Sequence, residues 1–432
     1  MSALSLHLCR FVAVVMLSAV AQPVLVRQNT FTRASLPKPT GEFGVGRTSF
    51  ELTDPSRDEP FAGTTSARRK IVAYVWYPVD KADLKGATPA PYLPGFERVR
   101  PLLTDADVKG MFRPATYSGP ASLPVTDVYE EAGMSKGKQK FPLVVFSHGW
   151  GNPTFLYTTE LEDIVSHGYI VLAVDHTYDT AYTEFKDGTL ALFAQKAFDE
   201  AVKQPHGFND YARARVAIMA QDNQFALTEI LKIASSKTQV PFYGRIDDQS
   251  IAAIGHSIGG LASARTCQID PRIRACMDQD SVDYRGSAFA VSDLETVEHQ
   301  PFFLFVVSSA DIWSSKMVNP TDHELAVQKM SRVEYGNLIR SEQANQDKQM
   351  AAIKGGAYRL MLFNVPDFSH RSFTDQTLLV TDEHHEAAVH NYKIAETYTL
   401  AFLDKYLKGL AAPVLDADTQ ADDHAVLQTF AR

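Results

Sequence analysis

Short, continuously apolar stretches alternate with longer amphipathic ones along most of this chain. The apolar stretches predict buried strands over residues 141–149, 169–176, 251–255, 274–278, 302–308 and 358–365, because a strand covered on both faces has no polar side. A further run at 70–78 ends in Pro78, which is typical of an outer strand.

Amphipathic stretches predict helices between these strands. One covers 156–167 and is stopped by Gly168, and a second covers about 212–235. The last covers about 391–408 and places Ala395, Tyr398, Phe402 and Tyr406 on one face. Strands that alternate with helices predict an α/β fold: a mostly parallel sheet with helices on both faces and ligands at the carboxyl ends of the strands. The polar, helical stretch 311–356 is expected to fold over such a site as a lid.

The strand at 251–255 runs directly into Gly255-His256-Ser257-Ile258-Gly259. This is a G-x-S-x-G nucleophile elbow in its required setting of strand, sharp turn and helix. The glycines let strand and helix approach closely, and the helix points free N–H groups at a developing oxyanion. The competing interpretation is a tight glycine turn with a buried serine.

A histidine-glycine turn, Ser147-His148-Gly149-Trp150-Gly151, follows the strand at 141–149. In α/β-hydrolases this turn supplies the second oxyanion donor. The sequence therefore predicts an α/β-hydrolase fold.

A nucleophilic serine needs a base, and the base needs an acid that fixes its tautomer. The chain order in this fold is Ser, then Asp or Glu, then His. Only His370 lies just past the last predicted strand; the other histidines that follow Ser257 are His299, His323, His384, His385, His390 and His424. For the acid, Asp278 and Asp311 each end a strand, Asp280 and Asp283 are further options, and order alone does not choose among them.

The stretch 382–390 is rich in metal-ligand side chains. His385 and His390 are five residues apart, however, whereas H-E-x-x-H places its histidines four apart on one helical face. We expect a solvated loop and helix start there, with no metal and no cofactor.

The net charge and the N-terminal sequence indicate which partners and which compartment to expect. The net charge of −9 over 432 residues argues against nucleic acid as a partner. Arg10 precedes an apolar run at 11–21 that is shorter than the about 20 residues needed to span a bilayer, and Ala19-Val20-Ala21 resembles a cleavage site. We expect a signal peptide over 1–21 cleaved after Ala21, a secreted or periplasmic hydrolase domain over 22–412, and a tail over 413–432.

Two cysteines would remain in the exported chain, Cys267 and Cys276. Two cysteines do not make a disulfide framework. A bridge is compatible with their spacing, but we expect two buried free thiols.

Several ordered stretches resemble the platelet-activating factor acetylhydrolases of the plasma and type II kind, which are group VII phospholipases A2. The resemblance covers about 72–409 and is carried by 143–151, 167–176, 255–260, 276–278 and 368–373. It implies a Ca²⁺-independent serine esterase with Ser257 as nucleophile, His370 as base and Asp278, rather than Asp311, as acid. The backbone N–H groups of Trp150 and Ile258 would be the oxyanion donors.

The chain departs from this family in three ways. Trp150 and Ile258 stand where the family has Leu and Phe, and the segment between Asp278 and His370 is longer. The lid should therefore differ, and with it the choice of substrate.

The sequence thus predicts hydrolysis of carboxylic esters, with lipids that carry a short or oxidised acyl chain as substrates. A lipid substrate would involve transient contact with a lipid surface, and the oligomeric state is left open. The alternative within this fold is a broad-range carboxylesterase, lipase or polyester hydrolase. A catalytically silent binding module is disfavoured because the Ser, Asp, His and histidine-glycine set is intact.

Overall fold

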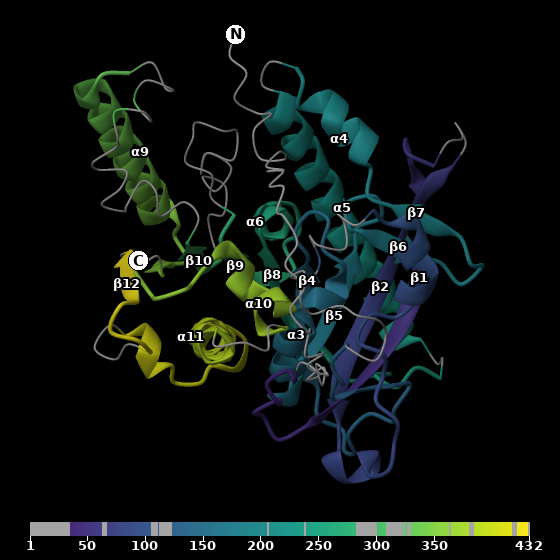
Figure 1. The fold of residues 1–432 in the computed structure, drawn as a ribbon. Coiled ribbons are helices and arrows are strands. Elements are labelled where there is room, and N and C mark those ends of the chain that lie inside the picture. The colour runs from purple at the N-terminus through teal and green to yellow at the C-terminus, as the bar shows by residue number, and fades with distance from the viewer. Residues whose placement is uncertain are drawn as a thin grey trace, which may run out of the picture. The chain divides into compact units, whose positions relative to one another are not determined.

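The computed structural model describes residues 35–62, 67–104, 111, 123–204, 207–236, 239–281, 300–307, 322, 325, 330–362, 364–379, 384–416 and 421–430. Its main feature is a ten-stranded sheet with the order β12-β11-β10-β9-β8-β4-β5-β2-β1-β3 (Figure 1). The strands are β1 (Gly44–Asp58), β2 (Arg68–Val79), β3 (Val128–Glu130), β4 (Phe141–Ser147), β5 (Ile170–Asp175), β8 (Ile246–His256), β9 (Ile273–Gln279), β10 (Phe302–Val306), β11 (Ala357–Met361) and β12 (Val426–Phe430). A separate hairpin joins β6 (Tyr182–Glu184) to β7 (Leu190–Leu192).

The centre of the sheet is parallel. β5, β4, β8, β9, β10 and β11 pair in parallel, while β2 and β12 join this block from either side as antiparallel strands. Every residue of β4, β5, β10 and β11 is buried, as the unbroken apolar runs predicted. The mostly parallel sheet predicted from the sequence is confirmed.

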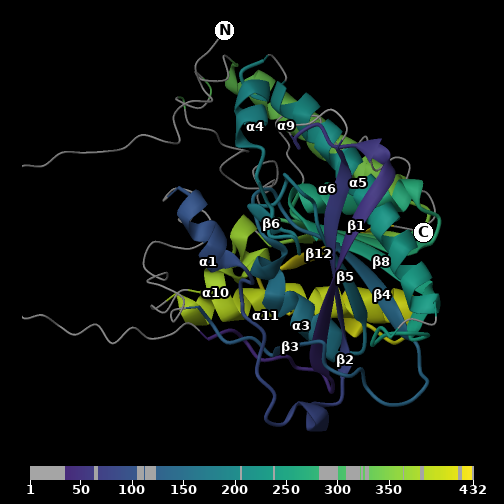
Figure 2. The ribbon, with the colours of Figure 1, turned by 90° about the vertical axis from the view of Figure 1, so that its right-hand side faces the viewer.

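Helices cover both faces of the sheet (Figures 1 and 2). They are α1 (Phe96–Val99), α3 (Thr158–Ser166), α4 (Gln195–Ala201), α5 (Gly207–Ser235), α6 (Ile258–Ile269), α9 (Arg332–Ala352), α10 (Asp375–Leu378) and α11 (His385–Leu403), with a π-helical turn at Asp404–Lys408. Short 3-10 turns are found at Lys81–Leu84, Arg100–Leu102, Thr154–Tyr157, His370–Phe373 and Pro413–Leu415.

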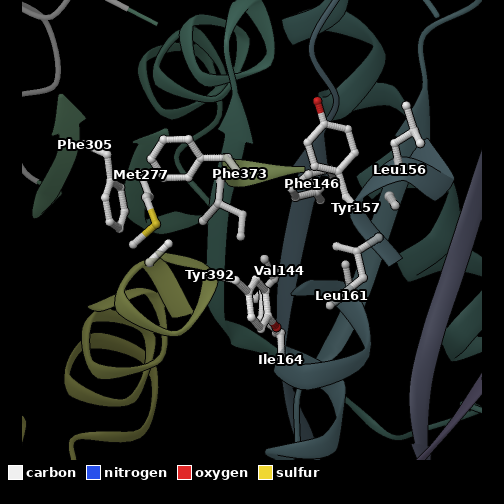
Figure 3. Close-up of a cluster of buried hydrophobic side chains, with 14 of the residues drawn as sticks. Val144, Phe146, Leu156, Tyr157, Leu161, Ile164, Met277, Phe305, Phe373 and Tyr392 are labelled. Carbon is white, nitrogen blue, oxygen red and sulfur yellow. The ribbon is translucent and has the colours of Figure 1, made fainter. Parts of the chain in front are cut away.

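Two apolar cores result from the alternation of side chains along the strands. One core joins the sheet to α3 and α11 through residues such as Val144, Met277 and Tyr392, and Figure 3 shows part of it. The other joins the opposite face to α5 and α6 through residues such as Val145 and Cys276. The sheet is therefore the middle layer of three.

The structure corrects the prediction of an outer strand at 70–78. β2 lies inside the sheet, between β1 and β5. Its pairing with β5 ends at Trp76, whereas its pairing with β1 continues through Pro78. The proline is tolerated because it lies where the strand has a partner on one side only.

Three strands of the ten-stranded sheet were not predicted, and neither was the β6–β7 hairpin. β1 and β3 extend the sheet beyond β2, and β12 comes from the segment 413–432, which was expected to be a tail. Arg359 of β11 bonds to Gln428 of β12 at 2.8 Å, so this part of the tail is integrated into the sheet.

The expected lid segment contains α9. Its first turn has a capping box formed by Ser331 and Glu334, and near its other end Met350 and Ile353 pack into the core with the sheet. Much of 311–330 lies outside the described residues, and closure over the site stays a prediction.

The cysteine expectation is wrong. Cys267 of α6 and Cys276 of β9 form a disulfide, which joins the helix that follows Ser257 to the neighbouring strand. The expected signal peptide over 1–21 lies outside the described residues. Within the described part of the chain, none of the helices combines the length and the apolar character that crossing a bilayer would take.

Candidate active site

Ser257 occupies a sharp turn between β8 and α6. Its φ and ψ angles are 57° and −131°, a strained conformation for a residue with a side chain. A Cβ on Gly255 would lie 2.4 Å from the carbonyl oxygen of Gly259, and one on Gly259 would lie 2.2 Å from that of Ser147. Only glycine fits at either position, so the local sequence produces the elbow for steric reasons.

The histidine-glycine turn after β4 lies against the elbow. A Cβ placed on Gly149 would be 3.2 Å from the Cβ of Ser257. Gly151 adopts a positive φ of 67°, and its N–H donates to the carbonyl of Asp179 at 2.8 Å. These contacts hold the turn at the carboxyl ends of β4 and β8. Ligands bind at this end of the strands in open α/β sheets.

Backbone N–H groups near Ser257 differ in their availability. The N–H of Gly149 already donates to the hydroxyl of Tyr157 at 2.9 Å. Ile258 is the first residue of α6, where an N–H has no partner within its own helix. The N–H of Ile258 therefore stays a candidate oxyanion donor, and the N–H of Trp150 stays a prediction from the sequence.

The side chain of Trp150 is anchored on one edge and faces aromatic rings on the other. Its indole N–H donates to Asp179 at 3.1 Å, and Asp179 forms a buried ion pair with Arg215 of α5. The ring centroids of Phe198, Phe208 and Tyr211 lie 5.4 to 5.9 Å from the indole. An apolar wall thus borders the turn that carries a candidate oxyanion donor.

His370 begins the short helical turn after β11 and contacts Asp280. Its Nδ1 lies 2.7 Å from Oδ2 of Asp280, and Oδ1 of Asp280 accepts the N–H of Val307 at 2.7 Å. The Asp280 side chain is fully buried, whereas that of His370 is 38% exposed. Because Nδ1–H donates to the carboxylate, Nε2 is the nitrogen left to accept a proton.

His370 is hydrogen-bonded to Asp280, whereas the sequence led us to expect a pairing with Asp278. The carboxylate of Asp278 accepts the N–H of Ser281 at 3.0 Å and also the Ser281 hydroxyl. It faces α6, since a Cβ on Gly260 would lie 2.2 Å from its Oδ1. Burial raises the pKa of Asp278 to about 7, so near neutral pH it is a poor partner for an imidazolium ion.

Backbone geometry explains why Asp280 takes this position. Asp278 lies within β9 and follows the alternation that points it at α6, whereas β9 ends at Gln279. Asp280 has a positive φ of 62°, which breaks the alternation and turns its carboxylate toward the end of β10. The other acids considered, Asp283 and Asp311, lie outside the described residues.

A second Ser–His–Asp arrangement lies deeper in the molecule. His176 contacts Asp222 at 3.1 Å through Nδ1 and Ser147 at 3.2 Å through Nε2. All three side chains are fully buried, and Asp222 is also paired with Arg69. No ester could reach this serine, so we assign the arrangement a structural role beneath the histidine-glycine turn.

The 382–390 stretch is partly outside the described residues. Within the described part, His390 pairs with Asp422 at 2.9 Å. The residues that the structure describes include no group of three or more His, Cys, Asp or Glu side chains arranged to hold a metal ion.

Four candidate groups therefore meet at one edge of the sheet. The histidine-glycine turn follows β4, Ser257 follows β8, Asp280 follows β9 and His370 follows β11. This parallel sheet with its nucleophile elbow defines an α/β-hydrolase.

Comparison with known proteins then identifies the family. The model of the family described as platelet-activating factor acetylhydrolase, isoform II, matches residues 28–412. The chain belongs to this family.

Individual relatives are more distant. A protein of Arthroderma benhamiae named "Probable 1-alkyl-2-acetylglycerophosphocholine esterase" is 27% identical over 253 residues, which cover 57% of this chain and 58% of the relative. The platelet-activating factor acetylhydrolase of Bos taurus is 25% identical over 314 residues, which cover 67% of this chain and 62% of the relative. The chain thus matches about three fifths of the length of these relatives.

A solved structure, the ferulic acid esterase from Streptomyces cinnamoneus, superposes with a TM-score of 0.62 and 20% identity. The superposition covers 92% of this chain and all of that chain. At this identity the similarity shows the fold alone.

Proposed function

We propose that this protein is a serine esterase that hydrolyses carboxylic esters through an acyl-enzyme. Its substrates would be lipid esters with a short or oxidised acyl chain, and it would need no Ca²⁺. The observation that carries the proposal is the 2.7 Å contact between His370 and Asp280, at the same sheet edge as the strained Ser257 elbow.

The reaction begins at Ser257. Nε2 of His370 takes the hydroxyl proton while Oγ attacks the ester carbonyl carbon. The imidazolium that forms donates through Nδ1 to Asp280, whose other oxygen stays bonded to Val307. The base is thus fixed in the tautomer that can accept a proton at Nε2.

The tetrahedral oxyanion then meets the backbone N–H groups of Trp150 and Ile258. One such donor contributes about 100- to 1,000-fold in rate in serine hydrolases. His370 returns the proton to the leaving alcohol, which leaves the acyl group on Ser257. A water molecule, deprotonated by His370, releases the acid and restores the serine.

Family membership favours a short acyl group over the broad-range carboxylesterase alternative. The relatives named above are, by their names, an esterase of 1-alkyl-2-acetylglycerophosphocholine and a platelet-activating factor acetylhydrolase, and an acetyl ester is common to both. Beside the oxyanion turn, the aromatic rings around Trp150 offer an apolar surface to the rest of a lipid ester.

A direct test compares acyl lengths. Purified protein in EDTA is offered p-nitrophenyl esters of increasing chain length together with a phospholipid that carries an sn-2 acetyl group. We expect kcat/KM to fall as the acyl chain lengthens and the acetyl phospholipid to be hydrolysed. Preference for long chains, with no action on the acetyl phospholipid, would contradict the substrate assignment and favour a general lipase.

Export is a further part of the proposal. The apolar run at 11–21 and the site after Ala21 support a signal peptide. The Cys267–Cys276 disulfide supports an oxidising compartment, since such bonds are rare in the cytosol. The mass of the mature protein from its native host tests this directly, and retention of residue 1 would contradict it.

A further inference from the structure

The hydroxyl of Tyr157 has three hydrogen-bond partners next to the nucleophile. It accepts the backbone N–H of Gly149 at 2.9 Å and the side-chain N–H of Asn152 at 3.1 Å. A hydroxyl has two lone pairs and one proton, so its own O–H is left for the third partner, Nδ1 of His256, at 2.9 Å. In Figure 3 the Tyr157 ring lies among the apolar side chains and its oxygen points away from them.

This arrangement also fixes the state of His256, the residue that precedes the nucleophile. Because Nδ1 accepts a hydrogen bond, the ring proton is on Nε2, which donates to the backbone carbonyl of His370 at 2.9 Å. Burial keeps the pKa of His256 well below its usual range, so the ring remains neutral. The His256 ring also lies against that of His370, with centroids 4.4 Å apart.

One hydrogen-bonded path therefore joins the histidine-glycine turn to His370, the candidate base. It runs from Gly149 through Tyr157 and His256 to the backbone of His370. The path passes beside Ser257, which follows His256 in the chain and lies so near Gly149 that a Cβ on Gly149 would be 3.2 Å from the Cβ of Ser257. Each donor along the path faces an acceptor. The histidine-glycine turn, the elbow and the segment of His370 therefore have a single arrangement in which all of these hydrogen bonds form together.

We propose that Tyr157 and His256 are positioning residues, which fix the histidine-glycine turn and the base, His370, in place relative to Ser257. The inference rests on the proposed esterase function. Neither side chain takes part in proton transfer. Their effect is geometric, and a displacement of about 1 Å at an active site costs about 100-fold in rate.

A matched control separates positioning from simple packing. Tyr169 is also fully buried, and its hydroxyl donates to Asp404 at 2.7 Å. It precedes β5 and so lies at the amino end of the parallel strands, away from Ser257. Tyr169→Phe therefore removes an equivalent buried hydroxyl without touching the path.

The experiment measures kcat, KM and the free energy of unfolding for the full-length protein with p-nitrophenyl acetate. We expect Tyr157→Phe and His256→Leu to lower kcat about 10- to 100-fold with KM changed less than about threefold. His256→Gln should recover part of the loss, because its amide offers both a donor and an acceptor. Tyr169→Phe should lose stability but keep its kcat.

A double variant supplies the second criterion. If Tyr157 and His256 act as one unit, Tyr157→Phe combined with His256→Leu should be about as slow as the slower single variant. Losses that multiply, or single variants that are destabilised but keep full kcat, would overturn the inference. If His256→Leu does not fold, Tyr157→Phe decides, since it removes one oxygen atom.

Labelling by a fluorophosphonate distinguishes this failure from failure of the proposed function. A wild-type protein that is not labelled at Ser257 would refute the esterase itself. A labelled wild type whose Tyr157→Phe variant turns over at the normal rate would refute only the positioning path.

Discussion

Replacing Asp280 by asparagine should disable the base without unfolding the protein. Val307 N–H donates to one carboxylate oxygen of Asp280, and His370 Nδ1–H donates to the other. An asparagine amide has only one oxygen. The backbone N–H cannot move, so the amide oxygen should turn to Val307 and its NH₂ group should face Nδ1.

His370 then adopts the tautomer that carries its proton on Nε2, which cannot accept the proton of Ser257. In a serine protease the same change at the triad acid lowers kcat by about 10,000-fold, equivalent to about 5.4 kcal/mol. Asp278→Asn is the matched control. Its carboxylate bonds to Ser281 and faces α6, so we expect a loss of about tenfold or less.

Both variants are assayed for kcat with p-nitrophenyl acetate at the same pH, about 8, so that their turnover can be compared directly. Circular dichroism confirms that each variant folds. If Asp278→Asn is the crippled variant and Asp280→Asn turns over normally, the assignment of the acid from this geometry is refuted.

Three further predictions concern stability and metals. Replacing Cys267 and Cys276 by alanine should lower the free energy of unfolding in urea by about 2–3 kcal/mol, because the bridge closes a loop between residues nine apart; unchanged stability would contradict this. Burial raises the pKa of Glu160 from 4.5 to about 8, so the folded state holds a proton that the unfolded chain releases, and Tm should fall as pH rises through this range. Glu160→Gln should flatten that decline, and an equally steep decline would argue against Glu160 as its source. EDTA should leave esterase turnover unchanged, whereas a loss restored by Zn²⁺ would redirect attention to residues 382–390.

Much of the fold could be predicted because its central strands are buried on both faces. The apolar runs at 141–149, 169–176 and 302–308 correspond to β4, β5 and β10. The position of β2 could not be read in the same way, because Pro78 is equally compatible with an edge strand and with the one-sided end of an interior strand. β12 is short and only partly buried, so its segment shows no clear apolar period.

The candidate site was predictable where chemistry imposes local spacing. Gly255, Ser257 and Gly259 are required by the elbow itself, and His370 follows from chain order. The choice between Asp278 and Asp280 depends instead on the backbone angle at one residue, which places Asp280 outside the alternation of β9. Acidic side chains two residues apart give no signal of such a turn, and the resemblance to the family was matched to Asp278, whereas His370 contacts Asp280.

The disulfide and the Tyr157–His256 path could not be predicted from the sequence for a different reason. Both depend on segments that meet only in the folded chain: α6 with β9 in one case, and the ends of β4, β8 and β11 in the other. Spacing along the sequence predicts neither contact.

Covalent labelling tests the central claim of a catalytic serine most directly. Full-length protein is treated with a fluorophosphonate, and the modified peptide is identified by mass spectrometry in parallel with a Ser257→Ala variant that folds. The proposed mechanism predicts one modification, on Ser257, with loss of esterase turnover in step with labelling and neither label nor turnover in the variant. Labelling of another residue, or a Ser257→Ala variant that keeps most of its activity, would contradict it.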